Sequence, residues 1–519
     1  MKRFLNALFF GKAAVPVFTL LAAISALLLH GFRNTNVFVD TVIFSGFSFA
    51  LFIAAVLDTA LLFCLWSTRL QAPEHTKGKA YRVLAVLGGI LAIVLAVIAF
   101  GFSFGNLFIG GSESLLVGLR LCKKSLPMWL GALALAAAAL LLPYIHKDRL
   151  KRIFSGILCV CLLIAVYAAF FPLTPFRFTA LPVVFDTGSA YSVVFATNDI
   201  GTAYIEYEIS GETVRRYDAS GGRKNGGSCI HTICVPYEEL TNNTYKVGAT
   251  RVLDELSYGG RSGKTIESES IAFGGTFSDE VKLLTLSDWH MQNRLALDTA
   301  QQLGSFDALI MLGDSATGLM QPEEVAAYIL DFGATLTGGQ KPVLFARGNH
   351  ETRGKEASNL PEYLGMDSLY YTAQFGQYHF IILDSGEDKA DDHPEYGGMT
   401  DYEQSRRDMV TWLQSLENPN GEKTIALSHS EEICIEEDLS AAAHEKLDSL
   451  GVSLLVSGHW HTTEFKTEHS YPTLIDGGWN ANGTNSYVAS MLTLTPEGVE
   501  ILSVDNSGQT TVQETVAWR

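Results

Sequence analysis

The residues of this sequence that could do chemistry come in five short groups, each directly after a run of apolar residues. The groups are Asp288-Trp289-His290, Gly313-Asp314, Gly348-Asn349-His350-Glu351, His429 and Gly458-His459-Trp460-His461. They supply carboxylate, amide and imidazole ligands and no thiolate, which favours first-row divalent ions over Ca²⁺ or a structural zinc site. The set is too large for one tetrahedral ion, so we expect two ions that share a carboxylate.

Each group alone has an ordinary explanation, since a single histidine is most often a surface or core residue and Gly-Asp is most often a turn. Groups of this kind after five predicted strands are hard to explain by coincidence, so we interpret them as one metal site. Two ions joined by a carboxylate lower the pKa of a bridging water and bind phosphate oxygens. Trp460, between His459 and His461, is expected to point away from them.

Alternating strands and helices must position these groups. The predicted buried strands are the apolar runs at 281–287, 306–312, 342–347, 378–384, 423–428 and 452–457. The predicted helices lie between them at about 291–304, 322–336, 402–416 and 438–450. Ligands in α/β folds gather at the carboxyl ends of the strands. The pattern therefore predicts an α/β domain over residues 279–519 with its site at these strand ends.

The order of the five groups resembles the signature of the calcineurin-like metallophosphoesterases, over about residues 279–505. The resemblance implies a β-sandwich core flanked by helices and two divalent ions, Mn, Fe or Zn. The implied ligands are, for the first ion, Asp288, His290 and His461, for the second, Asn349, His429 and His459, and for both, the bridging Asp314. His350 would be the catalytic residue, which faces the phosphate and protonates the leaving oxygen or steadies the transition state.

The resemblance also implies the reaction: hydrolysis of phosphate mono- or diesters in one step, by in-line attack of a metal-bound hydroxide on phosphorus. Glu351 could hold the tautomer of His350, or it could be an ordinary carboxylate at a helix start. Arg347 and Arg353 could grip phosphate oxygens, or they could be solvated or form structural ion pairs. The acidic, glycine-rich stretch 386–404 could be a rim or lid of the site.

Residues 178–275 form a string of short alternating runs separated by Gly, Asn and Ser, which is typical of a small β-sandwich domain. The run 240–245 resembles the turn into a late strand of fibronectin type III domains. Cys229 and Cys234 could form a local disulfide or stay two free thiols.

A β-sandwich before such a domain also resembles the purple acid phosphatases, with two departures. His290 stands where that family has glycine, and Thr317 stands where it has a tyrosine ligand. We therefore expect two divalent ions rather than a charge-transfer Fe³⁺ centre.

The N-terminal third has the composition of a membrane domain. Residues 1–172 contain 15 Lys+Arg and 5 Asp+Glu, which leaves 22 basic and 50 acidic residues for the remainder. A transmembrane bundle of about five helices is predicted over 1–173, because five apolar segments are each near the roughly 20 residues that cross a bilayer. These segments are 14–32, 41–66, 82–104, 127–145 and 153–172, with 105–121 as a loop or re-entrant piece.

Basic residues predict the orientation of this bundle. Eleven Lys and Arg lie on the side of the N-terminus and five on the other side. Five spans with a cytoplasmic N-terminus make a multi-pass cell-membrane protein whose catalytic domain is extracytoplasmic, and a sixth span within 105–121 would reverse that. Asp58, inside the second span, is either functional or a protonated or hydrogen-bonded carboxyl between helices.

The predicted function is that of a membrane-embedded phosphoesterase with two metal ions, acting on a small-molecule or lipid-linked phosphoester. The acidic soluble part argues against nucleic acid as the partner. The alternative is a membrane sensor or transport-related protein whose metal domain is a regulatory binding module. The sequence does not specify the substrate, the metal or the oligomeric state.

Overall fold

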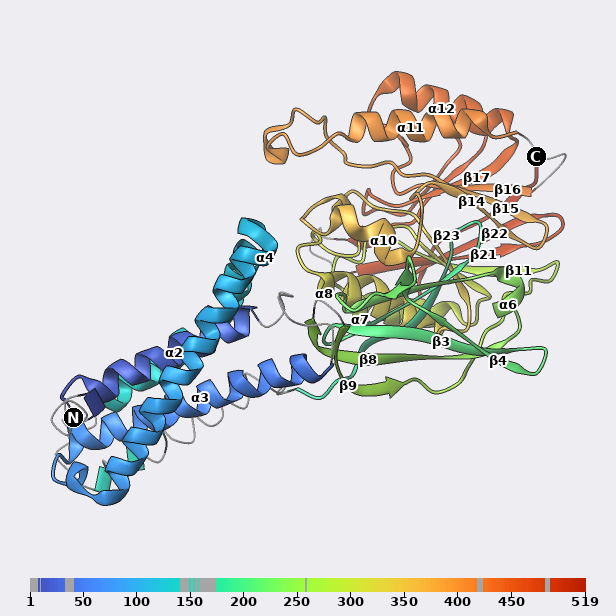
Figure 1. Cartoon of the computed structure of the whole chain (residues 1–519). Coiled ribbons are helices and arrows are strands. Elements are labelled where there is room, and N and C mark those ends of the chain that lie inside the picture. Colours follow the sequence, from blue (N-terminus) through green and yellow to red (C-terminus); the bar gives the residue numbers. More distant parts are fainter. Residues whose placement is uncertain are drawn as a thin grey trace. The chain divides into compact units, whose positions relative to one another are not determined.

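A computed structural model describes residues 8–9, 11–32, 42–140, 149–150, 153–154, 157, 174–256, 259–417, 423–480 and 486–519. The chain divides into two compact units, and Figure 1 shows the elements of each. The first unit comprises residues 1–175 with 253–262, and the second comprises 176–252 with 263–519. Each unit is described by itself below.

The first unit is helical, with α2 (Ala14–Phe32), α3 (Val42–Gln71), η1 (His75–Lys77) and α4 (Lys79–Leu140). Within the described residues, three stretches are long and apolar enough to cross a membrane: Ala14–Phe32, Phe47–Gln71 and Lys79–Gly105. They coincide with the first three predicted spans. These helices indicate that the protein associates with a membrane.

Helix α4 corrects the prediction for the rest of this region. It runs without interruption through 105–121, so the predicted loop or re-entrant piece is wrong. Its 62 residues extend about 90 Å at about 1.5 Å per residue. The predicted fourth span, 127–145, begins on this same helix, and nearly all of the fifth, 153–172, lies outside the described residues.

Asp58 lies in α3 against α4. It is buried, and neither carboxylate oxygen has a hydrogen-bond partner within the described residues. A Cβ placed on Gly88 of α4 would lie 3.0 Å from Asp58 Oδ1, so the two helix backbones approach closely here. A hydrogen bond to this carboxyl is therefore not observed within the described residues, and the functional role and the protonated carboxyl stay predictions.

The second unit is built on two large sheets. The ten-stranded sheet has the order β23-β22-β21-β11-β12-β13-β1-β2-β7, with β20 paired to β21. Its strands are β1 (Phe178–Asp186), β2 (Tyr191–Thr197), β7 (Ile230–Val235), β11 (Val281–Leu286), β12 (Ala308–Met311), β13 (Pro342–Phe345), β20 (Gly478–Asn480), β21 (Ser486–Leu494), β22 (Gly498–Asp505) and β23 (Thr510–Ala517).

The six-stranded sheet has the order β14-β15-β16-β17-β19-β18. Its strands are β14 (Tyr371–Phe375), β15 (Tyr378–Ile382), β16 (Lys423–Leu427), β17 (Val452–Ser457), β18 (Glu464–Lys466) and β19 (Thr473–Ile475). Buried apolar side chains of both sheets, such as Leu286 and Ile382, belong to one core cluster. This cluster joins the two sheets into the sandwich core that the resemblance implied.

Helices cover the sheets. α7 (Asn293–Ala300), η3 (Gln301–Leu303), α8 (Pro322–Val325), the π-helical η4 (Ala326–Leu330) and α9 (Asp331–Thr337) follow strands of the ten-stranded sheet. α11 (Tyr402–Ser415) and α12 (Glu437–Ser449) pack on the six-stranded sheet through a core cluster of their own. These helices coincide with the four predicted helical stretches within a few residues.

Shorter elements complete the second unit. They are β5 (Ala219–Ser220), β6 (Arg223–Lys224), α6 (Tyr237–Leu240), η5 (His350–Thr352), η6 (Ala357–Asn359), α10 (Leu360–Leu364) and η7 (Pro394–Tyr396).

The segment 178–275 is not a β-sandwich domain of its own. β1 pairs in parallel with β13, with Val184 opposite Pro342, so β1, β2 and β7 extend the sheet of the following region. A separate five-stranded sheet packs over them through a second core cluster. Its strands are β3 (Gly201–Ile209), β4 (Glu212–Tyr217), β8 (Thr244–Leu256), β9 (Gly259–Glu267) and β10 (Ile271–Ala272). One layer of the expected sandwich is therefore continuous with the next domain, and the fibronectin-like assignment is not supported.

Cys229 and Cys234 are free thiols, which is the second of the two alternatives that the sequence left open. Cys229 immediately precedes the extended strand β7, and Cys234 lies within it. Five residues of extended chain separate Cα atoms by about 16 Å, far beyond the roughly 7 Å that a disulfide can bridge.

Candidate metal centre

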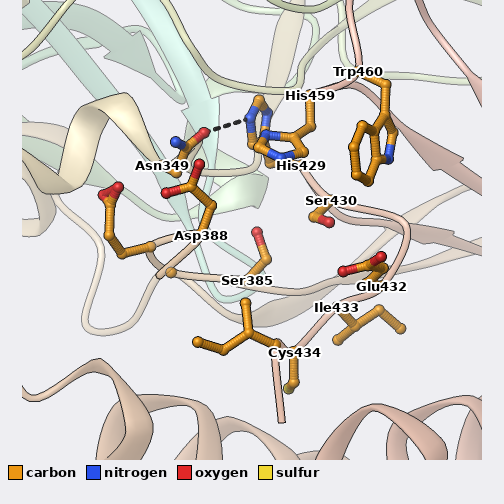
Figure 2. Close-up of a pocket in the computed structure, with 13 residues that line it drawn as sticks. Asn349, Ser385, Asp388, His429, Ser430, Glu432, Ile433, Cys434, His459 and Trp460 are labelled. Atoms are coloured by element: carbon orange, nitrogen blue, oxygen red, sulfur yellow. Dashed lines mark hydrogen bonds between the residues drawn. The ribbon is translucent and has the colours of Figure 1, made fainter. Parts of the chain in front are cut away.

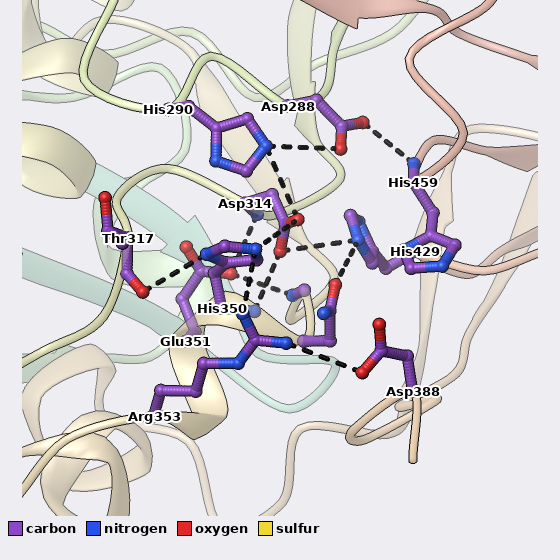
Figure 3. Close-up of polar contacts among 12 residues, drawn as sticks. Asp288, His290, Asp314, Thr317, His350, Glu351, Arg353, Asp388, His429 and His459 are labelled. Atoms are coloured by element: carbon purple, nitrogen blue, oxygen red, sulfur yellow. Dashed lines mark hydrogen bonds and ion pairs between the residues drawn. The ribbon is translucent and has the colours of Figure 1, made fainter. Parts of the chain in front are cut away.

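The five predicted groups stand at the ends of five strands from both large sheets. β11, β12 and β13 run parallel to one another, and so do β16 and β17. Parallel strands place their carboxyl ends at one edge, and the loops that leave these edges carry the predicted residues. Figure 3 shows side chains from all five loops pointing toward one another.

The backbone at these strand ends is left-handed at residues that are not glycine. The φ angles are 49° at Asp288, 37° at His290, 56° at Asp314, 74° at His459 and 55° at His461. Each such residue costs about 1–3 kcal/mol, a strain that persists only where the surrounding structure enforces it. The strained backbone is therefore concentrated where the donor side chains are aimed.

Two glycines of the predicted groups permit close approach of neighbouring loops. A Cβ on Gly348 would lie 2.3 Å from Asp314 Oδ1, and a Cβ on Gly458 would lie 1.7 Å from Ser287 Oγ. No side chain fits at either position, which explains why both groups begin with glycine.

Asp288, His290 and His461 form the first set of donors. The Nε2 atoms of His290 and His461 lie 3.1 Å apart, and Asp288 Oδ1 lies 3.8 Å and 3.5 Å from them. His461 Nδ1 donates to the carbonyl of Trp479 at 2.6 Å, so its Nε2 carries the lone pair. The three donor atoms lie within 4.8 Å of one another, as an ion would require.

Asp314, His429 and His459 form the second set, with donor atoms also within 4.8 Å. His429 Nε2 lies 3.4 Å from Asp314 Oδ1, while its Nδ1 donates to the carbonyl of Leu312 at 2.6 Å. Asn349 belongs beside this set, because its Oδ1 is 3.1 Å from His429 Nε2.

Asp314 stands between the two sets. Its Oδ2 lies 3.6 Å from His290 Nε2 of the first set, and its Oδ1 faces His429 of the second. Burial acts to raise the pKa of Asp314, but the neighbouring imidazoles, His429 above all, hold that pKa below its usual range. Asp314 is therefore an anion shared by both sets.

The donor sets fit cations, because hydrogen-bond acceptor atoms of different side chains face one another in them. Asn349 Oδ1 lies 3.1–3.3 Å from His429 Nε2, His459 Nδ1 and both oxygens of Asp314. Asp288 Oδ1 is fully buried and has no hydrogen-bond partner within the described residues. Lone pairs gathered in a buried site are unfavourable unless a cation lies among them.

The amide of Asn349 provides a test of that fit. With the amide reversed, its nitrogen would donate to the four acceptors, and its oxygen would accept from Arg353 Nη2 at 2.8 Å. That orientation suits a site without metal. A cation selects the orientation in which the oxygen faces His429, since an amide binds metals through oxygen.

Burial keeps two of the histidines neutral. It lowers the pKa of His290 and of His459 to about 4. Neutral imidazole is the form that binds a metal, so both are ready for it at neutral pH.

His350 lies at the edge of the two sets. Its Nδ1 donates to the carbonyl of Thr317 at 3.1 Å, so Nε2 carries the lone pair. That Nε2 lies 3.8 Å from Asp314 Oδ2 and accepts from Arg353 Nη1 at 3.0 Å. The donor atoms of His350, His290 and Asp314 are also within 4.8 Å of one another. The side chain is 22% exposed, so it can be reached from solvent.

Glu351 does not hold the tautomer of His350, and that predicted alternative is wrong. Its buried carboxylate accepts from the backbone N–H groups of Asp314, Ser315 and Gly348 at 2.8, 2.6 and 2.9 Å. It thereby ties the loop after β12 to the loop after β13, and the carbonyl of Thr317 orients His350 instead.

Comparison with known families identifies this region. The sequence model of the family described as Calcineurin-like phosphoesterase matches residues 281–463. The chain contains a calcineurin-like phosphoesterase domain. This domain is accordingly that of a metal-dependent phosphoesterase, and its His and Asp donor sets are the groups that would hold divalent metal ions.

Two of the solved structures that are similar to this chain are a plant enzyme and a parasite protein. A purple acid phosphatase from yellow lupin seeds is 15% identical, with 64% of this chain and 73% of that chain covered and a TM-score of 0.43. GAP50, the anchor in the inner membrane complex of Plasmodium, is 14% identical, with 47% and 90% covered and a TM-score of 0.34. None of the curated proteins matches the chain.

The two arginines of the phosphoesterase domain have different surroundings. Arg347 is buried and forms two bonds of 3.0 and 2.7 Å to Asp384, so it is a structural ion pair rather than a phosphate ligand. Arg353 is partly exposed and pairs with Glu387 while it also donates to His350. Arg353 is therefore within reach of a group bound at His350.

A cavity of about 230 Å³ opens beside the second donor set of the phosphoesterase domain (Figure 2). Its lining residues include Asn349, His429, His459 and Asp388, and also Ser385, Glu432 and Trp460, which sequence analysis did not assign to the site. Ser385 and Asp388 follow β15, which is the fourth predicted strand, and Asp388 lies in the stretch 386–404 that was expected to form a rim or lid.

Trp460 does not turn away from the site as expected. Its ring centroid lies 5.1 Å from that of His459 in an edge-on arrangement, and its indole lines the cavity. The left-handed backbone at His459 and His461 breaks the alternation of an extended strand on which that expectation rested.

Proposed function

We propose that this chain is a membrane-anchored phosphoesterase that hydrolyses phosphate mono- or diesters at a centre of two divalent ions. The observation that carries the proposal is the pair of donor sets that share Asp314. In this proposal Asp288, His290 and His461 hold one ion, Asn349, His429 and His459 hold the other, and Asp314 bridges them.

The bound ions would supply positive charge for the phosphate oxygens and lower the pKa of coordinated water. The protein positions the rest. Thr317 fixes the ring of His350 so that Nε2 points at the bound phosphate, where it can hold the proton that the leaving oxygen receives. Arg353, which donates to that Nε2, is placed to bind a phosphate oxygen when substrate arrives.

The chain would work at a membrane through its apolar helices. Three helices long enough to span support the anchor, and the excess of basic residues near the N-terminus supports a cytoplasmic N-terminus. The proposed location is therefore a multi-pass cell-membrane protein with the phosphoesterase domain outside the cytoplasm. The orientation can be tested with a reporter that works only in the cytoplasm, fused after Arg519. Activity of this reporter would overturn the proposed orientation.

The proposed activity is tested with the full chain purified in detergent and supplied with Mn²⁺. We expect hydrolysis of a chromogenic phosphomonoester, phosphodiester or both, and none after chelation. Two bound metal ions without turnover of either ester would reject the enzyme and favour the alternative, a regulatory metal-binding module of a membrane sensor or transport-related protein.

A further inference from the structure

The cavity beside the second donor set contains a buried hydroxyl group that has no hydrogen-bond partner within the described residues. Ser385 is 5% exposed, lines the cavity, and has no hydrogen-bond partner for its Oγ within the described residues. In Figure 2 this hydroxyl points into the pocket. A buried hydroxyl without a partner is unfavourable, and a polar group of a bound molecule would remove that cost.

The charge of the cavity wall restricts what that molecule carries. Three acidic residues line the cavity, and no Lys or Arg is among its described lining residues. Glu387 pairs with Arg353, and Asp388 pairs with Arg353 and Lys389, whereas Glu432 forms no ion pair within the described part of the chain. A second phosphate would face these carboxylates and be repelled. A positively charged group would be attracted.

Trp460 adds a surface that also favours a cation. Its indole is 45% exposed and lines the same cavity as Glu432. A cation over an indole face is attracted by the electrons of the ring, and a nearby carboxylate adds to that attraction. The two side chains therefore form one end of the cavity that is suited to an ammonium group.

The size of the cavity limits the molecule further. At 230 Å³ it is smaller than the roughly 300 Å³ at which pockets for drug-sized ligands begin. An alcohol of a few heavy atoms fits within it.

We propose that the substrates of this site are phosphate esters of small amino alcohols. This inference rests on the proposed function. The phosphate binds at the metal centre, and the amino alcohol enters the cavity with its ammonium group at Trp460 and Glu432. Ser385 donates to an oxygen of the substrate. Hydrolysis adds water across the P–O bond: the water oxygen joins phosphorus, and the departing alcohol oxygen keeps the bonding electrons and takes a proton.

The test compares two esters that differ in one group. Phosphoethanolamine and 2-hydroxyethyl phosphate have nearly the same shape, but only the first carries an ammonium. For the full chain in detergent with Mn²⁺, we expect kcat/KM to be at least about tenfold higher for phosphoethanolamine, which corresponds to about 1.4 kcal/mol. Equal values, or a preference for the neutral ester, would overturn the inference.

Variants show whether the named residues cause the preference. Glu432→Gln and Trp460→Leu should each reduce the ratio of the two kcat/KM values by about threefold or more, mainly through KM. Glu437→Gln, an exposed acid in the first turn of α12 outside the cavity, is the matched control and should leave the ratio unchanged. A ratio unaffected by both cavity variants would also overturn the inference.

The same comparison with dispersed lysophospholipids separates two sources of the amino alcohol. A preference for the ethanolamine headgroup over the glycerol headgroup, with faster turnover than the soluble ester, assigns the substrate to lipid, and the reverse assigns it to soluble esters. Hydrolysis of p-nitrophenyl phosphate without any amine preference would reject this inference alone. No hydrolysis of any ester by the metal-loaded protein would reject the proposed function itself.

Discussion

Asp314 accepts, through Oδ1, a hydrogen bond of 2.9 Å from the backbone N–H of His350. The carboxylate proposed to bridge the two ions is thus tied to the residue proposed to move a proton. Because the bond uses the backbone of His350, the imidazole stays free to act on substrate. The distance between Asp314 and His350 is therefore set by the fold. A substitution of either residue can be tested separately.

Asp314→Asn should remove most bound metal from the protein. The amide keeps an oxygen for the N–H of His350 but loses the negative charge that both ions would share. We expect metal content to fall below one ion per chain and turnover to fall by at least about 100-fold, measured by elemental analysis and phosphate release. Asp298→Asn, on the exposed surface of α7, is the matched control. Retention of two ions would contradict the bridging role.

His350→Ala should lower turnover and leave the metal in place. A lost proton-transfer residue costs about 10²–10⁴ in rate, while the proposed ligands are unaffected. The metal content and kcat are measured on the same preparations. His393→Ala, a partly exposed loop histidine, serves as the comparison. If metal is lost together with activity, His350 is a ligand and its assigned role is wrong.

Glu351→Gln should destabilise the protein without altering its shape. The carboxylate accepts from three backbone N–H groups, and hydrogen bonds to a charged group contribute about 1.5–3 kcal/mol each. The amide retains one acceptor oxygen, so we expect a loss of a few kcal/mol and a clear fall in Tm by calorimetry. Glu362→Gln, an exposed acid in the first turn of α10, should not change Tm. An unchanged Tm for Glu351→Gln would mean that the loops are held by other contacts.

Arg347→Ala should cost about 3–5 kcal/mol, because it leaves the carboxylate of Asp384 buried without its partner. The double variant Arg347→Met with Asp384→Leu removes both charges and should recover part of that loss. Denaturant unfolding of the two variants gives the comparison. Arg347→Ala with full stability but weaker phosphate binding would restore the phosphate-ligand role that the structure argues against.

The five donor groups were accessible from sequence, because each follows a mainly apolar run and parallel strands bring their ends together. Ser385 was not, since a serine after a strand has no distinctive pattern. Its importance comes from a cavity wall to which the loops after β13, β16 and β17 also contribute, and only the fold assembles that wall.

The partners of β1 and the continuity of α4 could not be predicted for related reasons. β2 is buried on both faces, with Val193 in one core cluster and Val194 in the other, which is the mark of a strand inside a large sheet rather than a small sandwich. The pairing of β1 with β13 joins residues far apart in sequence, so no local pattern encodes it. In α4, glycines weaken the helix between 105 and 121 but do not end it.

The parallel pairing of Val184 with Pro342 also restricts how this protein could have been assembled in evolution. A gene fusion or deletion with its junction near residue 275 would strip a neighbour from β13 and leave an unsatisfied, aggregation-prone edge. We expect the residues from 176 onward to have been inherited together as one unit. Library designs that recombine such enzymes should place their crossover points ahead of β1.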